Sequence, residues 1–262
     1  MKRLFSLLLM TALVTTSLFT FGMSGNVYAA TTWNYTVLGD SLGTGFGAWY
    51  GYVSRYRDHM EDDTGITVNL NNLSVNGWTS TDLLDALKND PFYREAVASA
   101  DVVTWDVGGN DMRKARNSYI SETCGGANNE DCLREAVDTF QSNWDQIVSI
   151  IHDLRAEKPT NFKTMNVYNP YVNEDKAAPS YDGSTTRFAV FKPYLDEVNQ
   201  FIDNQQSRGY EMADIYTAFN GPNHDQDPGD KGYIFLDGLH PNDTGHRVIA
   251  EHFRSLGYDP LQ

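Results

Sequence analysis

The sequence predicts a three-layer α/β/α sandwich, folded as a single domain around a five-stranded parallel sheet. Short β-branched or aromatic runs alternate with longer amphipathic stretches along the chain. Strands joined by helical crossovers pair in parallel, and the helices then cover both faces of the sheet. No internal repeat or low-complexity linker interrupts the alternation. We therefore expect an α/β fold with one domain.

Five runs are typical of strands because they are rich in β-branched and aromatic residues. They are residues 33–38, 66–71, 101–107, 163–168 and 211–216. Helical patterns lie at 48–62, 80–99, 131–157, 188–207 and 243–256. Asn242 or Asp243 can cap the last helix. Ligands of open parallel sheets bind at the carboxyl ends of the strands, so the loops after strands one, two, three and five should meet at one edge.

Residues 1–29 have the layout of a secretory signal peptide. Two basic residues precede an apolar run that ends near Met23, and small residues mark a cleavage position near Ala29. We expect a secreted protein whose mature domain comprises residues 30–262. The mature sequence has no second apolar stretch long enough to cross a bilayer, so we expect no stable membrane anchor after cleavage.

The chain is strongly acidic. Its 35 acidic and 20 basic residues give a formal net charge of −15, and loss of the leader leaves 18 basic residues and a charge of −17. Such a surface repels phosphate backbones, which excludes nucleic acid as a partner. It also disfavours anionic lipid surfaces.

Cys124 and Cys132 are the only cysteines, and in an exported protein this close pair indicates one disulfide. Closing so short a loop contributes at most about 2–3 kcal/mol. A metal site would need further ligands nearby, which this segment does not supply. Residues 223–232 hold three aspartates but lack the downstream glutamate of an EF-hand loop. We favour a mobile acidic lid there and leave calcium binding open.

The segment TVLGDSLGTGFG, residues 36–47, places four glycines and one serine directly after the first strand. Its glycine spacing occurs in nucleotide-binding reductases, but the chain has neither their Tyr-x-x-x-Lys pair nor a Gly-Lys-Ser/Thr phosphate loop. The G-x-S-x-G elbow of α/β-hydrolases also matches. That elbow follows several earlier strands, whereas Ser41 is only about the twelfth mature residue.

The remaining interpretation is a serine nucleophile whose partners lie at the other end of the chain. A serine hydroxyl needs a base to take its proton, and the base needs an anion to orient it. His240 and Asp237 offer both within one short turn. A developing oxyanion needs fixed donors, and Gly77 and Asn110 lie on suitable loops to supply an N–H and a side-chain amide.

Neighbouring residues have structural explanations. A second Asp-x-x-His, Asp243 to His246, is interpreted as a helix cap with a residue of the first or second helical turn. Asp40 and Asp111 flank the candidate site, and we expect their carboxylates to fix loop geometry by accepting from backbone N–H groups. Phe46 could belong to the core or line an acyl pocket, and both alternatives stay open.

Four blocks occur in order along the mature chain. They are Gly39-Asp40-Ser41-Leu42, Gly77, Gly108-Gly109-Asn110-Asp111 and Asp237-Gly238-Leu239-His240-Pro241. With these blocks the chain resembles the SGNH-type hydrolases of the GDSL lipase/esterase family, and the pattern spans nearly all of the mature sequence. The resemblance implies a flavodoxin-like fold, Ser41 as nucleophile, His240 as base and Asp237 as its partner. It implies oxyanion donors from the Ser41 and Gly77 N–H groups and from Asn110, and no metal or organic cofactor.

The expected function is hydrolysis of short- to medium-chain carboxylic esters through an acyl-serine intermediate, by a monomer. A carbohydrate O-acetyl esterase, a phospholipase or lysophospholipase, and a catalytically dead binding module are the alternatives. The substrate would be a small-molecule, lipid or carbohydrate ester. Residues 112–130, 173–186 and 220–236 are poor in large apolar residues. We therefore expect a shallow groove roofed only by these flexible segments.

Overall fold

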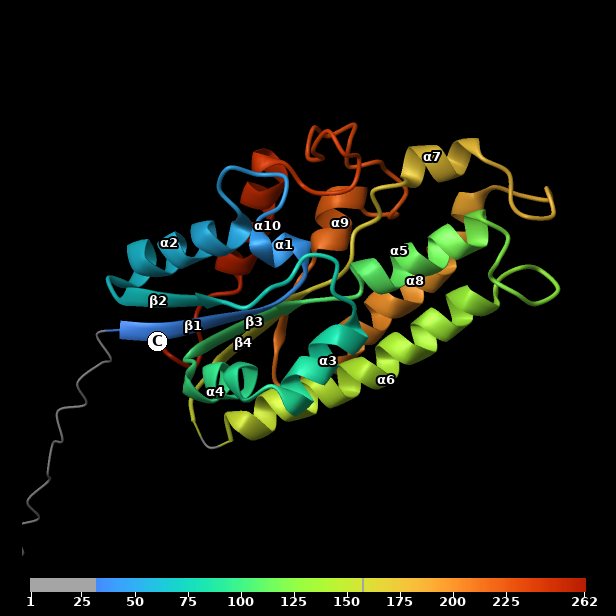
Figure 1. Cartoon of the computed structure of the whole chain (residues 1–262). Coiled ribbons are helices and arrows are strands. Elements are labelled where there is room, and N and C mark those ends of the chain that lie inside the picture. The colour runs from blue at the N-terminus through green and yellow to red at the C-terminus, as the bar shows by residue number, and fades with distance from the viewer. Residues whose placement is uncertain (1–31, 157) are drawn as a thin grey trace, which may run out of the picture. The chain divides into compact units, whose positions relative to one another are not determined.

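Five parallel strands form the sheet in the order β2-β1-β3-β4-β5, as the computed structural model shows for residues 32–156 and 158–262 (Figure 1). The predicted leader, residues 1–29, lies outside the described residues. The strands are β1 (Thr32–Gly39), β2 (Thr67–Asn72), β3 (Val102–Asp106), β4 (Asn161–Met165) and β5 (Glu211–Ala213). From β1 the chain crosses to β2 on one side of β1, and from β2 it returns to β3 on the other side of β1. The carboxyl ends of β1 and β3 therefore border a switch point, where ligands of such sheets bind.

Helices cover both faces of this sheet. They are α1 (Ser41–Thr44), α2 (Tyr52–Thr64), α3 (Ser80–Asn89), α4 (Pro91–Ser99), α5 (Gly109–Ile120), α6 (Asp131–Leu154), α7 (Val172–Ala177), α8 (Arg187–Asn204), α9 (Ile215–Asn220) and α10 (Asp243–Ser255), with a 3-10 turn at Gln205–Arg208. Crossovers between parallel strands are right-handed, so α2 lies on the face opposite α3, α4, α6 and α8 (Figure 1). The predicted α/β/α sandwich is confirmed.

Each face has its own apolar core. Tyr35 from β1 and Tyr56 from α2 pack edge to face at 5.7 Å under Phe253 of α10. On the other face, Trp105 of β3 packs against Trp144 of α6 at 6.0 Å. Aromatic pairs at these separations stabilise a core beyond the area they bury. Strands β1 and β3 contribute side chains to both cores and are therefore covered on both faces.

The predicted single helix at 80–99 is two helices, because the chain breaks at Asp90–Pro91. A residue before proline is pushed towards extended conformations, and Asp90 has φ −99° and ψ 112°. Its carboxylate then caps α4 by accepting from the Phe92 N–H at 2.8 Å. Proline suits the first position of a helix, where its missing N–H costs nothing.

The predicted strand at 211–216 ends at Ala213. Asp214 accepts from the Thr217 N–H at 3.1 Å and so begins helix α9. Helix α5 is a second difference, because residues 112–130 were expected to be flexible. Met112, Ala115 and Tyr119 are buried from this helix at spacings of three and four, which is a helical pattern among otherwise polar residues.

Cys124, in the loop after α5, and Cys132, in the first turn of α6, are joined by a disulfide. No helix of the described residues is long and apolar enough to span a membrane.

Candidate active site

The serine loop begins where β1 ends beside β3. Gly39 has φ +139°, and a Cβ built on it would lie 1.7 Å from a carboxylate oxygen of Asp106, the last residue of β3. Only glycine fits so close an approach. Asp40 then caps α1 by accepting from the Leu42 N–H at 2.9 Å. Ser41 is thereby placed as the first residue of α1, at the carboxyl end of the sheet.

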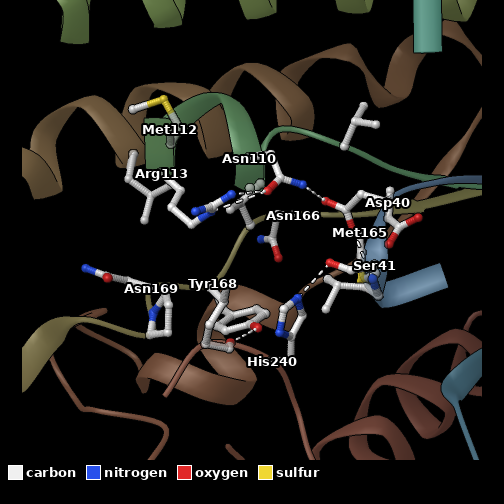
Figure 2. A pocket seen from close by; sticks show the side chains of 18 of the residues that line it. Asp40, Ser41, Asn110, Met112, Arg113, Met165, Asn166, Tyr168, Asn169 and His240 are labelled. Carbon is white, nitrogen blue, oxygen red and sulfur yellow. Dashed lines mark hydrogen bonds between the residues drawn. The ribbon is translucent and has the colours of Figure 1, made fainter. Parts of the chain in front are cut away.

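Ser41, His240 and Asp237 form one continuous row of hydrogen bonds. The Ser41 Oγ lies 2.8 Å from His240 Nε2, and His240 Nδ1 lies 2.6 Å from Asp237 Oδ2 (Figure 2 shows the first contact). The other Asp237 oxygen accepts from the backbone N–H groups of Leu239 and His240, each at 3.0 Å. Partial burial raises the pKa of Asp237, but the hydrogen bonds from His240 and the backbone outweigh it, so the pKa is lowered overall. Asp237 is an anion fixed beside the imidazole.

The turn that carries His240 is held on both sides. The Phe235 N–H donates to the His240 carbonyl at 2.7 Å, and Ile234 and Pro241 form an antiparallel bridge. The Tyr168 hydroxyl, from the segment after β4, donates to the Leu239 carbonyl at 2.6 Å. The imidazole thus sits on a closed turn tied to the sheet, a placement that suits a group that must stay in reach of Ser41.

The two predicted oxyanion residues, Asn110 and Gly77, differ in their placement. Asn110, in the first turn of α5, is buried at the site, and its side-chain NH₂ donates to Asp40 Oδ2 at 3.0 Å and to the Trp78 carbonyl at 2.9 Å. Arg113, one turn later, donates to Asn110 Oδ1 at 3.1 Å. Gly77 lies in the exposed turn after β2 with φ +83°. It is linked to the site through its neighbour Trp78.

A pocket opens beside Ser41 and His240, and helices form much of its wall. Its apolar lining includes Met112 of α5 and both Phe191 and Leu195 of α8. The chain after β4 adds further lining residues, of which Figure 2 shows Tyr168. The expectation of a groove roofed only by flexible segments was therefore wrong. Sequence analysis missed Arg113, which also lines the pocket, although its position one turn after Asn110 was a usable signal.

Comparisons with known proteins identify the family of this chain. The family model of the GDSL-like lipase/acylhydrolase family matches residues 37–248. The chain belongs to this family. The GDSL protein is 29% identical over 236 residues to the spore germination lipase LipC of Bacillus licheniformis, across 88% of this chain and 99% of the relative. It is 26% identical to the uncharacterized protein YpmR of Bacillus subtilis, over 82% of this chain and 77% of the relative.

A solved lipase structure has the same overall fold as this chain. The lipase Lip_vut3 from a goat rumen metagenome is 28% identical to the GDSL protein, with a TM-score of 0.73 over 88% of this chain and all of that one. The GDSL protein is accordingly a carboxylic-ester hydrolase with the α/β/α fold of its relatives.

The second Asp-x-x-His of the GDSL protein serves the structure. His246 is fully buried, and its Nδ1 accepts from the Tyr52 N–H at 3.1 Å. Nε2 must then carry the ring proton, and it donates a hydrogen bond to the Phe46 carbonyl at 3.2 Å. Burial lowers the pKa of His246 to about 4, so the ring is neutral at pH 7. Asn242 caps α10, while the Asp243 carboxylate accepts from the Trp49 and Tyr50 N–H groups.

Asp111 and the acidic segment 223–232 both make hydrogen bonds that order the backbone around them. Asp111 accepts from the Ser80 N–H at 3.0 Å and from its hydroxyl, which fixes the start of α3 as expected. In the acidic segment 223–232, Asp227 accepts from the Asn173 and Gly229 N–H groups. Among the described residues, no three His, Cys, Asp or Glu side chains gather in a way that could hold a metal ion.

Two buried acids lie close together at the serine loop, Asp40 on the loop itself and Asp106 beneath it. Asp106 is 2% exposed, and neither carboxyl oxygen has a hydrogen-bond partner among the described residues, although the Asp40 and Gly43 N–H groups lie nearby. Burial raises the pKa of Asp106 well above its ordinary value of 3.8, and the charge of Asp40 adds to this shift. Burial also raises the pKa of Asp40, to about 7.

These acids should make the fold less stable as the pH rises. The folded state keeps a proton that the unfolded chain releases near pH 4, so this stabilisation is complete below pH 4 and is lost through about pH 7. Asp106→Asn removes one acid at nearly constant shape. Between pH 5 and pH 8, the variant should lose less unfolding free energy than the wild type, by on the order of 1 kcal/mol or more. Urea unfolding at both pH values measures this, and parallel losses in the two proteins would contradict it.

Proposed function

We propose that this GDSL hydrolase is a secreted esterase that cleaves short- to medium-chain carboxylic esters through an acyl-Ser41 intermediate. The observation that carries the proposal is the unbroken row from Ser41 Oγ through the His240 ring to Asp237. His240 Nε2 takes the hydroxyl proton as Ser41 Oγ attacks the ester carbonyl. The Asp237 carboxylate accepts a hydrogen bond from the Nδ1–H of His240 and stabilises the imidazolium that forms. His240 then gives its proton to the leaving alcohol, and water releases the acid by the same steps.

The oxyanion is proposed to form beside α1. Ser41 is the first residue of this helix, and the first N–H groups of a helix have no carbonyl partner within it. The Asn110 amide lies on the same side, held by Asp40 and polarised through its oxygen by Arg113. It would turn one N–H from Asp40 or Trp78 towards the oxyanion as charge develops. The Gly77 N–H is the third proposed donor, on the turn that Asn110 contacts through Trp78.

Chain length should be limited by where the apolar wall ends. Each methylene that Met112, Phe191 or Leu195 covers contributes about 0.8 kcal/mol. The same pocket is lined by Arg113 and by the amide of Asn169, whose buried Nδ2 has no partner among the described residues. Arg113 is only partly buried, so a longer chain laid over its guanidinium would remove water from it without replacing the hydrogen bonds to that water, which costs free energy.

We therefore expect kcat/KM to rise over the first few acyl carbons, to peak at short or medium length, and to decline for long chains. A series of p-nitrophenyl esters from acetate to palmitate measures this. Acetylated xylan and a lysophospholipid, assayed in parallel, test the two other substrate classes. A maximum at palmitate, or turnover confined to either of those substrates, would overturn the proposed specificity. No turnover of any ester would support a dead binding module.

Export is proposed on two features. The leader sequence has the charged, apolar and small-residue order of a signal peptide. The disulfide between Cys124 and Cys132 suits an oxidising compartment outside the cytosol.

A further inference from the structure

The two most exposed large apolar side chains of the described residues lie on loops that border His240. Trp49, on the loop between α1 and α2, is 99% exposed, and Leu236, in the turn that precedes His240, is 96% exposed. Phe46 and Phe235, on the same two loops, are 44% and 39% exposed. We name these four residues the mouth patch.

The two loops touch each other and the active-site histidine. A Cβ built on Gly47 would lie 2.5 Å from the Pro241 carbonyl oxygen and 3.2 Å from the His240 Cβ, so the two loops pack directly against each other. The Phe46 ring lies 4.4 Å from the His240 ring, centre to centre. Phe46 thus brings one member of the mouth patch against the imidazole beside Ser41, and the other three members lie on the same two loops.

The backbone beneath the patch is fixed. The Trp49 and Tyr50 N–H groups donate to the two oxygens of the Asp243 carboxylate, at 3.2 and 3.1 Å. The Leu236 turn is closed by hydrogen bonds from the Phe235 N–H to the His240 carbonyl and from the Gly238 N–H to the Phe235 carbonyl. Apolar side chains on a backbone that is already ordered lose less conformational freedom on binding.

Grouped exposed apolar side chains of this kind mark contact with another apolar phase. Leu236 has no flat face to stack on a sugar, which favours a lipid over a polysaccharide. Without the leader the chain has a charge of −17, and Asp237 and Asp243 lie beside the patch. This negative charge repels anionic lipid headgroups. We propose that the mouth patch docks the enzyme on an uncharged lipid surface, so that the Ser41 site opens onto short- and medium-chain esters dissolved in that surface. This rests on the proposed esterase function.

The test is binding to phosphatidylcholine vesicles. Residues Thr31–Gln262 form a compact unit, so the chain from Thr31 on is used and the apolar leader does not contribute. The double variant Trp49→Ser/Leu236→Ser should bind the vesicles at least about tenfold more weakly than the wild type, because membrane affinity scales with buried apolar area. Its kcat/KM for dissolved p-nitrophenyl acetate should stay within about twofold, which also shows that the variant folds.

Phe92→Ser is the matched control. Phe92 is 59% exposed, but it lies on α4, which leads into the amino end of β3 and thus to the opposite edge of the sheet. Vesicle binding by this variant should equal that of the wild type.

Tryptophan fluorescence locates the contact. Of the five tryptophans, Trp33, Trp105 and Trp144 are buried and Trp78 is partly buried. A change in fluorescence on vesicle binding should therefore come from Trp49. Vesicles should shift the wild-type emission to shorter wavelength. Trp49→Phe should keep most of the binding and lose the shift.

Four results would overturn the proposal. Two concern the wild type: no binding to phosphatidylcholine vesicles, or tighter binding to phosphatidylglycerol than to phosphatidylcholine. Two concern the double variant: binding to vesicles equal to that of the wild type, or a loss of binding to acetylated xylan instead of to vesicles. Each leaves turnover of dissolved esters intact. Failure of the esterase function itself would instead remove that turnover from the wild type.

Discussion

Replacing Ser41 with Ala should lower kcat/KM for p-nitrophenyl acetate by roughly 10³-fold or more, because the covalent route disappears. The fold should be unaffected. The hydroxyl contacts His240 Nε2 at the mouth of the pocket, and no other hydrogen bond of the described residues uses Ser41 Oγ. Steady-state kinetics measure the loss, and urea unfolding checks that stability is retained.

A covalent probe separates this interpretation from general loss of function. A fluorophosphonate should label the wild type at Ser41, and the Ser41→Ala protein should remain unlabelled. Peptide mapping identifies the modified serine. Label on a different serine would mean that the row ending at His240 is not the nucleophilic site.

The two Asp-x-x-His histidines should respond in opposite ways to substitution. His240→Ala removes the group beside Ser41 and should lower kcat/KM by roughly 10³-fold while stability is kept. His246→Ala leaves the Tyr52 N–H and the Phe46 carbonyl without their buried partner. It should lower the free energy of unfolding by about 1–3 kcal/mol for each group, with a much smaller effect on turnover.

Asp237→Asn supplies the graded control. The closed turn and Tyr168 still hold the backbone of His240, so part of the orientation survives, and the loss of kcat/KM should be smaller than for His240→Ala. Kinetics and urea unfolding on the three variants give the order of severity. If His246→Ala is more damaging to kcat/KM than His240→Ala, the wrong pair has been assigned.

Much of the fold follows from sequence pattern alone. All five strands are where β-branched and aromatic runs predicted them, within a few residues, because a buried parallel strand needs such side chains. Two of the boundaries that differ are set by single caps. Asp90 with Pro91 divides one expected helix in two, and Asp214 ends β5 early. Helix α5 was missed because its first residues are Gly109 and Asn110, which favour helices weakly.

The sequence by itself determined the residue types of the site and their order, because a serine nucleophile needs a base and an anion, and a parallel sheet brings its strand ends to one edge. Only the tertiary structure decided what surrounds them. Phe191 and Leu195 reach the pocket from α8, some 150 residues after Ser41 in the chain, and Asp106 lies buried beneath Gly39. Such contacts depend on how helices and strands distant in sequence pack together, and no local pattern of residues encodes that packing.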